Sequence, residues 1–145
     1  MRGLLLSPAL AIRIEGHVRS ELPREACGLM IGQTGNGLLV VDRVMPSANL
    51  APVECLDRFE IDSALHLREQ AAARESGHEI LGIYHSHPNG LPEPSDRDLD
   101  GAWIPDFVWL ILAPGADQTT RWGAFFRGKT ATFEPLEIFA KEPKT

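Results

Sequence analysis

Near the start of the chain, apolar residues recur every four positions, the spacing that places side chains along one side of a helix. This apolar side consists of Leu10, Ile14, Val18 and Leu22. Ser7 followed by Pro8 is typical of a helix N-cap and first helical position, and Pro23 cannot continue a helix. The pattern therefore predicts an amphipathic helix that begins at Pro8 and ends before Pro23.

Two further segments carry helix signals. Asp62 can cap a helix that runs to Ser76, and Gly77 is a typical C-terminal stop. Ser95 can open a short third helix that extends through Trp103.

Short apolar runs bounded by turn residues predict the strands. They cover residues 25–31, 38–45, 58–61, 80–85, 107–113, 119–126 and 130–133. Residues 33–37 form a hairpin turn, and residues 47–56 and 86–94 form loops. Helices interleaved with strands predict an α/β fold, a mixed sheet covered by helices.

Length and composition indicate one globular unit. A chain of 145 residues corresponds to a single domain over 1–145, and 43% hydrophobic with 23% charged residues is ordinary for such a domain. No apolar run is long enough to span a bilayer, so we expect no membrane partner. The net charge of −6, without a cluster of lysines or arginines, argues against nucleic acid.

Cysteine content and the N-terminus bear on the compartment. Two cysteines, Cys27 and Cys55, allow one disulfide at most, and we expect both to be small apolar side chains. The apolar stretch from Leu4 to Leu6 is too short for a signal peptide. We therefore expect a cytoplasmic protein.

The segment that carries chemistry is Tyr84-His85-Ser86-His87-Pro88. Side chains two apart on a strand share a face, so His85 and His87 can ligate one metal ion. Asp98, at the start of the next helix, can supply a third ligand. Two imidazoles and one carboxylate, with a fourth position left for water, make a catalytic zinc set, which predicts one Zn²⁺ per chain.

Hydrolysis also needs a proton carrier and an oxyanion donor that are not ligands. Glu25, at the head of a buried strand, is the candidate general acid/base. Ser95 is the candidate donor to the oxyanion.

Each of these residues also has a structural interpretation. A lone histidine is more often a surface or core residue, and Ser95-x-x-Asp98 alone is a capping box, although a capped helix end would also fix Asp98. Asn49 and Asp57 can border a substrate groove, but capping of their own loop is the simpler role. Cys27 paired with a histidine would be a different nucleophile, which explains fewer residues. The tryptophans Trp103, Trp109 and Trp122 are expected to pack.

The order Glu25, His85-Ser86-His87, seven residues, then Ser95-x-x-Asp98 resembles the motif of the JAMM (MPN-plus, Mov34/PAD-1) metalloproteases, in particular their short bacterial and archaeal branch. By this resemblance, His85, His87 and Asp98 match the zinc ligands. Glu25 matches the general acid/base, and Ser95 the hydroxyl that stabilises the intermediate. The family fold is similar to cytidine deaminase, a curved mixed sheet packed between helices.

The resemblance implies a zinc metallopeptidase that hydrolyses a peptide, isopeptide or cysteine-adduct bond after the C-terminal diglycine of a ubiquitin-like or sulfur-carrier protein. Two other functions are compatible with parts of the pattern. One is a non-catalytic MPN scaffold that binds partner proteins, and the other is a zinc deaminase, whose Cys-x-x-Cys motif the sequence lacks. The carrier's identity, the leaving group (cysteine, peptide or lysine side chain), the oligomeric state and any redox role of the cysteines stay open.

Overall fold

The computed structural model describes residues 3–101, 104–130 and 132–143. Its three helices are α1 (Pro8–Glu21), α2 (Ser63–Glu75) and α3 (Asp96–Gly101). Its strands are β1 (Gly3–Leu5), β2 (Cys27–Gly35), β3 (Leu38–Ser47), β4 (Glu79–Ser86), β5 (Phe107–Pro114), β6 (Thr120–Arg127) and β7 (Phe133–Phe139). This order of elements confirms the α/β class. Within the described residues, no helix is long and apolar enough to cross a membrane.

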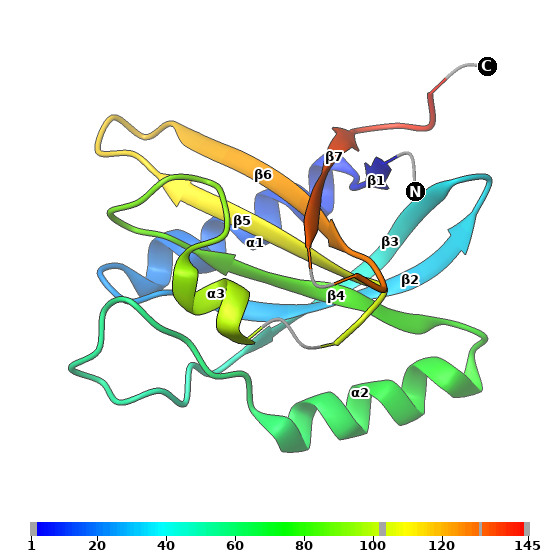
Figure 1. Ribbon diagram of the computed structural model, residues 1–145, viewed down its shortest axis with the longest axis horizontal. Helices are drawn as coiled ribbons and strands as arrows, with labels where there is room; N and C mark the ends of the chain where they lie inside the picture. Colours follow the sequence, from blue (N-terminus) through cyan, green and yellow to red (C-terminus); the bar gives the residue numbers. More distant parts are fainter. Residues whose placement is uncertain (1–2, 102–103, 131, 144–145) are drawn as a thin grey trace.

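The strands form one mixed sheet that closes on itself in the order β1-β3-β2-β4-β5-β6-β7 (Figure 1). The short strand β1 closes it by pairing in parallel with β3 on one side and with β7 on the other. Strands β4 and β5 are also parallel, and the remaining neighbours are antiparallel. The sheet is therefore mixed, as the sequence predicts.

Two hydrophobic cores lie against the sheet. One contains Ile14 and Val18 of α1, and the other contains Leu65 and Ala73 of α2. The two helices are separate in Figure 1, with α2 along one side of the sheet and α1 behind it. Alternate residues of β5 divide between the cores, since Val108 belongs to the α1 core and Trp109 to the α2 core.

The predicted helix boundaries are confirmed where capping residues set them. The hydroxyl of Ser7 accepts a hydrogen bond from the backbone N–H of Leu10 at 3.3 Å. The carboxylate of Asp62 accepts one from the N–H of Ala64 at 3.0 Å. Gly77, just beyond α2, has a φ of +76°, which favours glycine. The third helix is described over Asp96–Gly101, and the last two residues of the prediction, 102 and 103, lie outside the described part of the chain.

The strand predictions differ from the structure in several places. The strand predicted over 25–31 is β2, Cys27–Gly35, so it begins after Glu25 and continues into the predicted 33–37 turn. β1 was not predicted, because three residues are too few to show a period. The last strand begins at Phe133 rather than spanning 130–133, and the strand predicted over 58–61 is only an isolated bridge between Asn49 and Ile61. Pro46 does not end β3 but pairs with Gly28. A proline is tolerated there because β1 pairs only with the far end of β3, so the missing N–H faces no strand.

Two strand pairings bring the predicted site residues together. β2 runs antiparallel to β4, so Cys27 at the beginning of β2 lies opposite His85 near the end of β4. β4 runs parallel to β5, so His85 also lies beside Ile111. Glu25 comes just before β2, and His87 comes just after β4. Because β2 and β4 are antiparallel neighbours, both residues lie at the same end of these two strands.

We predict that Gly28→Ala destabilises the fold by about 1–3 kcal/mol, the usual cost of overpacking a core. A Cβ atom at position 28 would lie 2.3–2.5 Å from ring and hydroxyl atoms of Tyr84. That ring cannot move aside easily, because it is fully buried and its hydroxyl is hydrogen-bonded to Nδ1 of His17 at 2.7 Å. Urea unfolding followed by circular dichroism measures the change.

The matched control is Gly16→Ala. Apart from the backbone of its own helix and its chain neighbours, no described atom lies within 4 Å of a Cβ built at Gly16, which is inside α1. This variant is expected to gain about 0.5–1 kcal/mol. Equal stability of Gly28→Ala and the wild type would show that the packing of Tyr84 does not require glycine.

Candidate metal centre

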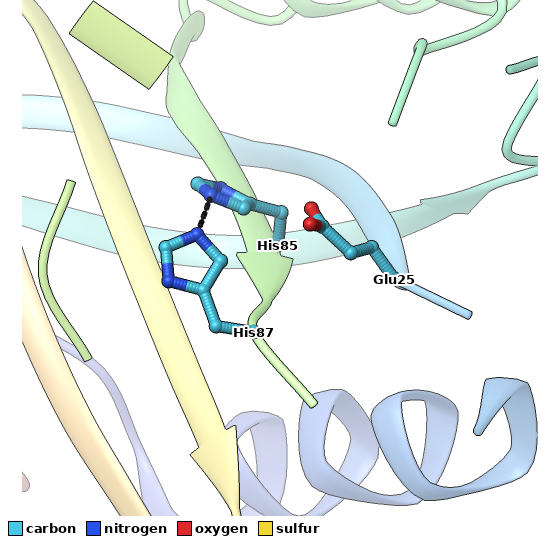
Figure 2. A group of neighbouring side chains, drawn as sticks. All are labelled: Glu25, His85 and His87. Atoms are coloured by element: carbon cyan, nitrogen blue, oxygen red, sulfur yellow. Dashed lines mark hydrogen bonds between the residues drawn. The ribbon is translucent and has the colours of Figure 1, made fainter. Parts of the chain in front are cut away.

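Three side chains meet at the end of β4. The Nε2 atoms of His85 and His87 are 3.1 Å apart, and Oδ2 of Asp98 lies 3.1 Å from the first and 3.0 Å from the second. All three residues are buried. Figure 2 shows the two imidazoles turned toward each other from the end of the strand. The structure thus brings together the three residues that the sequence predicts as ligands.

The rings of the two histidines are held in different ways. Nδ1 of His87 lies 2.8 Å from the carbonyl oxygen of Leu91, which only accepts, so a neutral His87 carries its proton on Nδ1 and presents a lone pair at Nε2. Nδ1 of His85 has no hydrogen-bond partner among the described residues. Its ring is instead stacked on Phe59 at 4.4 Å between centroids and touched edge-on by Trp109 at 5.5 Å. Phe59 is a contact that the sequence analysis missed.

Asp98 is fixed by the start of α3. The backbone N–H of Ser95 donates to Oδ2 of Asp98 at 3.0 Å, and the N–H of Asp98 donates to Oγ of Ser95 at 3.1 Å. This is the reciprocal bonding of a capping box. The Ser95 hydroxyl only accepts in this pair, so its own proton stays available to another acceptor. The role of Ser95 and Asp98 as a capping box is therefore compatible with the place of Asp98 in the cluster.

Charge and burial set the protonation of the cluster. Burial lowers the pKa of His85 and so favours neutral imidazole, the form that ligates a metal. Burial alone would raise the pKa of Asp98, but the adjacent imidazoles of His85 and His87 and the backbone N–H of Ser95 hold it well below its usual range. Asp98 is therefore a carboxylate.

Glu25 lies beside this cluster. One of its carboxylate oxygens is within 4.8 Å of ring nitrogens of both His85 and His87 (Figure 2). The side chain is 5% exposed, and its Oε1 has no hydrogen-bond partner among the described residues. Burial raises the pKa of Glu25 to about 7. Its carboxyl group can therefore take up and give back a proton near neutral pH.

The backbone around Glu25 is held from two sides. On one side, Ser86 donates its N–H to the carbonyl of Ala26 at 3.1 Å, and its hydroxyl accepts from the N–H of Ala26 at 2.8 Å. On the other, the side-chain amide of Asn49 donates to the carbonyls of Glu25 and Arg58 at 3.0 and 3.1 Å. Asn49 also accepts from two backbone N–H groups of its loop. It therefore caps its loop and also attaches that loop to the site.

Two pockets adjoin the cluster. The first, which we call the arginine pocket, has a volume of about 500 Å³ and is lined by residues that include Arg58, Phe59, Arg97, Asp98 and Trp109. The second, the glutamate pocket, has a volume of about 510 Å³ and is lined by residues that include Glu25, Asp57, His87, Glu93 and Ser95. Asp98 thus lines the first pocket, and His87 lines the second.

The donor atoms fit a metal ion such as zinc. A tetrahedral site with bonds of about 2.0 Å has donor atoms about 3.3 Å apart, close to the 3.0–3.1 Å separations of the two nitrogens and the Asp98 oxygen. A nitrogen and carboxylate set is one that zinc prefers. The unpartnered oxygen of Glu25 is farther away, where it can face a fourth position.

The remaining polar candidates lie elsewhere. Cys27 is fully buried, and burial raises its pKa to about 12, so its thiol is no activated nucleophile. His78 contacts Asp42 and Ser76, away from the cluster. Trp109 and Trp122 pack against the two cores, whereas Trp103 lies outside the described residues.

Three solved or curated proteins give the scale of similarity. The chain is 32% identical to the desampylase of Haloferax volcanii over 97 residues, which is 67% of this chain and 68% of that protein. It is 36% identical to the probable TtuB-protein conjugate cleaving protease of Thermus thermophilus, over 63% of this chain and 59% of that one. The solution structure of protein DSY2949 from Desulfitobacterium hafniense superposes with a TM-score of 0.84 at 30% identity, covering 97% and 94% of the two chains.

A family model covers nearly all of the structural elements. Residues 7–127, from the cap of α1 to the end of β6, match the model described as prokaryotic homologs of the JAB domain. This span includes all five residues that the motif singles out, and it confirms the resemblance to the JAMM/MPN proteins on the prokaryotic side. The chain belongs to the family of prokaryotic homologs of the JAB domain.

Proposed function

We propose that this protein is a zinc metallopeptidase in which His85, His87 and Asp98 hold one zinc ion and Glu25 and Ser95 do catalytic work. The observation that carries the proposal is the meeting of three donor atoms at 3.0–3.1 Å beside a buried, unpartnered carboxylate oxygen. A buried polar atom without a partner destabilises the folded state, so such a combination does not serve stability. It is typical of a hydrolytic site.

Zinc in such a site lowers the pKa of water and makes hydroxide available at neutral pH. Glu25 accepts the proton of the attacking water and delivers it to the nitrogen of the scissile bond. The hydroxyl of Ser95 donates to the oxygen of the carbonyl group as negative charge develops there. The products are a carboxylic acid on one side and a free amine on the other. Glu25 returns to its starting state, because it gives the nitrogen the proton that it took from water.

The proposed substrate is a ubiquitin-like or sulfur-carrier protein, cut after its C-terminal diglycine. The names of the two curated relatives, a desampylase and a conjugate cleaving protease, support release of a protein from a conjugate. We include in the proposal the cytoplasmic location, a single domain over 1–145 and the cytidine-deaminase-like arrangement of the sheet. The packing of α1 and α2 in separate cores supports that arrangement.

We predict that Glu25→Gln keeps its zinc but loses about 10²–10⁴-fold in cleavage rate, the usual contribution of a general acid/base. The amide keeps the size of the side chain but cannot carry the proton. The substrate is a diglycine-tailed carrier protein with a C-terminal extension, and intact-mass spectrometry detects a product that ends in the diglycine. Elemental analysis measures the zinc. Retained turnover in this variant would contradict the assigned base, and no turnover in zinc-loaded wild type would favour the scaffold.

We predict that Asp98→Ala abolishes the stabilisation that zinc confers. A ligand present at about 100 times its Kd stabilises the folded state by about 2.7 kcal/mol, and the variant lacks one of the three donors. Thermal unfolding with and without zinc measures the difference. The control is Asp100→Ala, which removes an exposed carboxylate from the same helix and should respond to zinc as the wild type does. An equal shift in both variants would show that Asp98 is no ligand.

We predict that iodoacetamide modifies only Cys55 in the native protein. Cys27 is fully buried with a raised pKa, whereas Cys55 is partly exposed. Peptide mass mapping should find Cys27 modified only after denaturation, and Cys27→Ala should cleave as fast as the wild type. Rapid labelling of native Cys27 with loss of activity would revive a thiol mechanism.

A further inference from the structure

The two pockets that flank the cluster differ in charge. The arginine pocket is lined by two arginines, Arg58 and Arg97, and by two carboxylates, Glu60 and Asp98. Among the described residues that line the glutamate pocket, three carry carboxylates and none is a lysine or arginine. The three are Glu25, Asp57 and Glu93. A substrate that crosses the cluster therefore passes from a side where arginines balance the carboxylates to a side lined by carboxylates without an arginine or lysine.

The proposed mechanism fixes which end of the substrate enters which pocket. Hydrolysis breaks the C–N bond, adds hydroxide to the carbonyl carbon and returns a proton to the nitrogen. Glu25 must reach that nitrogen to deliver the proton, and Glu25 lines the glutamate pocket but not the arginine pocket. The leaving amine therefore lies in the glutamate pocket.

The charges of the glutamate pocket are not equally compensated. Asp57 lies 3.7 Å from Arg97 and 3.9 Å from Arg58, so two cations offset it. Glu93 is exposed and has no ion-pair partner among the described residues. Glu25, 5% exposed, has an unpartnered oxygen at the inner end of the pocket. A negative charge on the leaving group would therefore meet Glu93, a carboxylate that no cation among the described residues offsets.

We propose that the glutamate pocket selects leaving groups without a carboxylate next to the scissile nitrogen, and that Glu93 is the residue that determines this specificity. A lysine side chain on a target protein meets the condition, since its α-carboxyl group is in a peptide bond at the far end of the side chain. A free amino acid such as cysteine does not, because its α-carboxylate is one carbon from the nitrogen. The inference rests on the proposed function and narrows it to isopeptide conjugates.

The test uses two substrates that differ by one charge. Both are a diglycine-tailed carrier protein extended by a single cysteine, which ends in a free carboxylate in one and in a carboxamide in the other. We expect the zinc-loaded wild type to cleave the carboxamide at least about fivefold faster in kcat/KM at low salt. The ratio should shrink in 1 M salt, where the screening length is about 3 Å. A lysine-linked conjugate should be cleaved at least as fast as the carboxamide.

Substitution of Glu93 tests whether this residue determines the preference between the two substrates. Glu93→Gln should reduce the ratio at least about threefold, mainly by faster cleavage of the free acid. Glu134→Gln changes the net charge equally at an exposed position on β7 outside the pocket and should keep the wild-type ratio. Equal cleavage of both substrates by the wild type, or an unchanged ratio in Glu93→Gln, would overturn the inference while leaving the peptidase intact.

A binding measurement separates this inference from the proposed function. Zinc-loaded Glu25→Gln protein, which is not expected to turn over, is titrated with each intact substrate by calorimetry. Tighter binding of the carboxamide, lost in the Glu25→Gln/Glu93→Gln double variant, supports the inference even if the wild type cuts neither substrate. Equal affinities, or no binding of either substrate, overturn it.

Discussion

The site depends on one backbone junction, the pair of hydrogen bonds between Ala26 and Ser86. The bond from the Ser86 N–H continues the ladder between β2 and β4 past its last paired residues, and the Ser86 hydroxyl takes the place of a further backbone acceptor. Because side chains alternate along a strand, Ser86 points away from the face that carries His85 and His87. The junction thus fixes Glu25 beside two imidazoles that come from a distant part of the sequence, without occupying any of the space between them.

Around this junction the protein maintains polar groups that its own side chains do not satisfy. Oε1 of Glu25 and Nδ1 of His85 are buried and find no partner in the described part of the chain, and an unmade hydrogen bond costs about 1–3 kcal/mol. Two hydrophobic cores on separate faces of the sheet supply the stability that offsets this cost. Phe59 and Trp109 pack against the His85 ring and hold it in place where Nδ1 makes no hydrogen bond to a described residue.

Local signals in the sequence predict the elements that carry their own boundaries. Ser7 and Asp62 cap helices, and the apolar run of β5 can only be a strand or a buried helix segment of the same length. β1 is not predicted, and the limits of β7 and of the 58–61 segment are predicted wrongly, because pairing with residues distant in the sequence defines them. The contact of Phe59 with His85 is equally invisible in the sequence. The linear motif names five residues, and the structure gathers them at one edge of the sheet. The roles of these residues stay predictions, because geometry alone does not measure chemistry.

The closure of the sheet by β1 has a consequence for how the chain is made. Leu5 of the first strand pairs with Phe139 of the last, and β1 also pairs with β3. Contacts of such large sequence separation raise the contact order and slow folding. On the ribosome, β1 can meet β3 early, but its other edge stays open until residue 139 has left the exit tunnel. The nascent chain therefore exposes an unpaired strand edge during synthesis, which is the period when it is most open to aggregation and to chaperones.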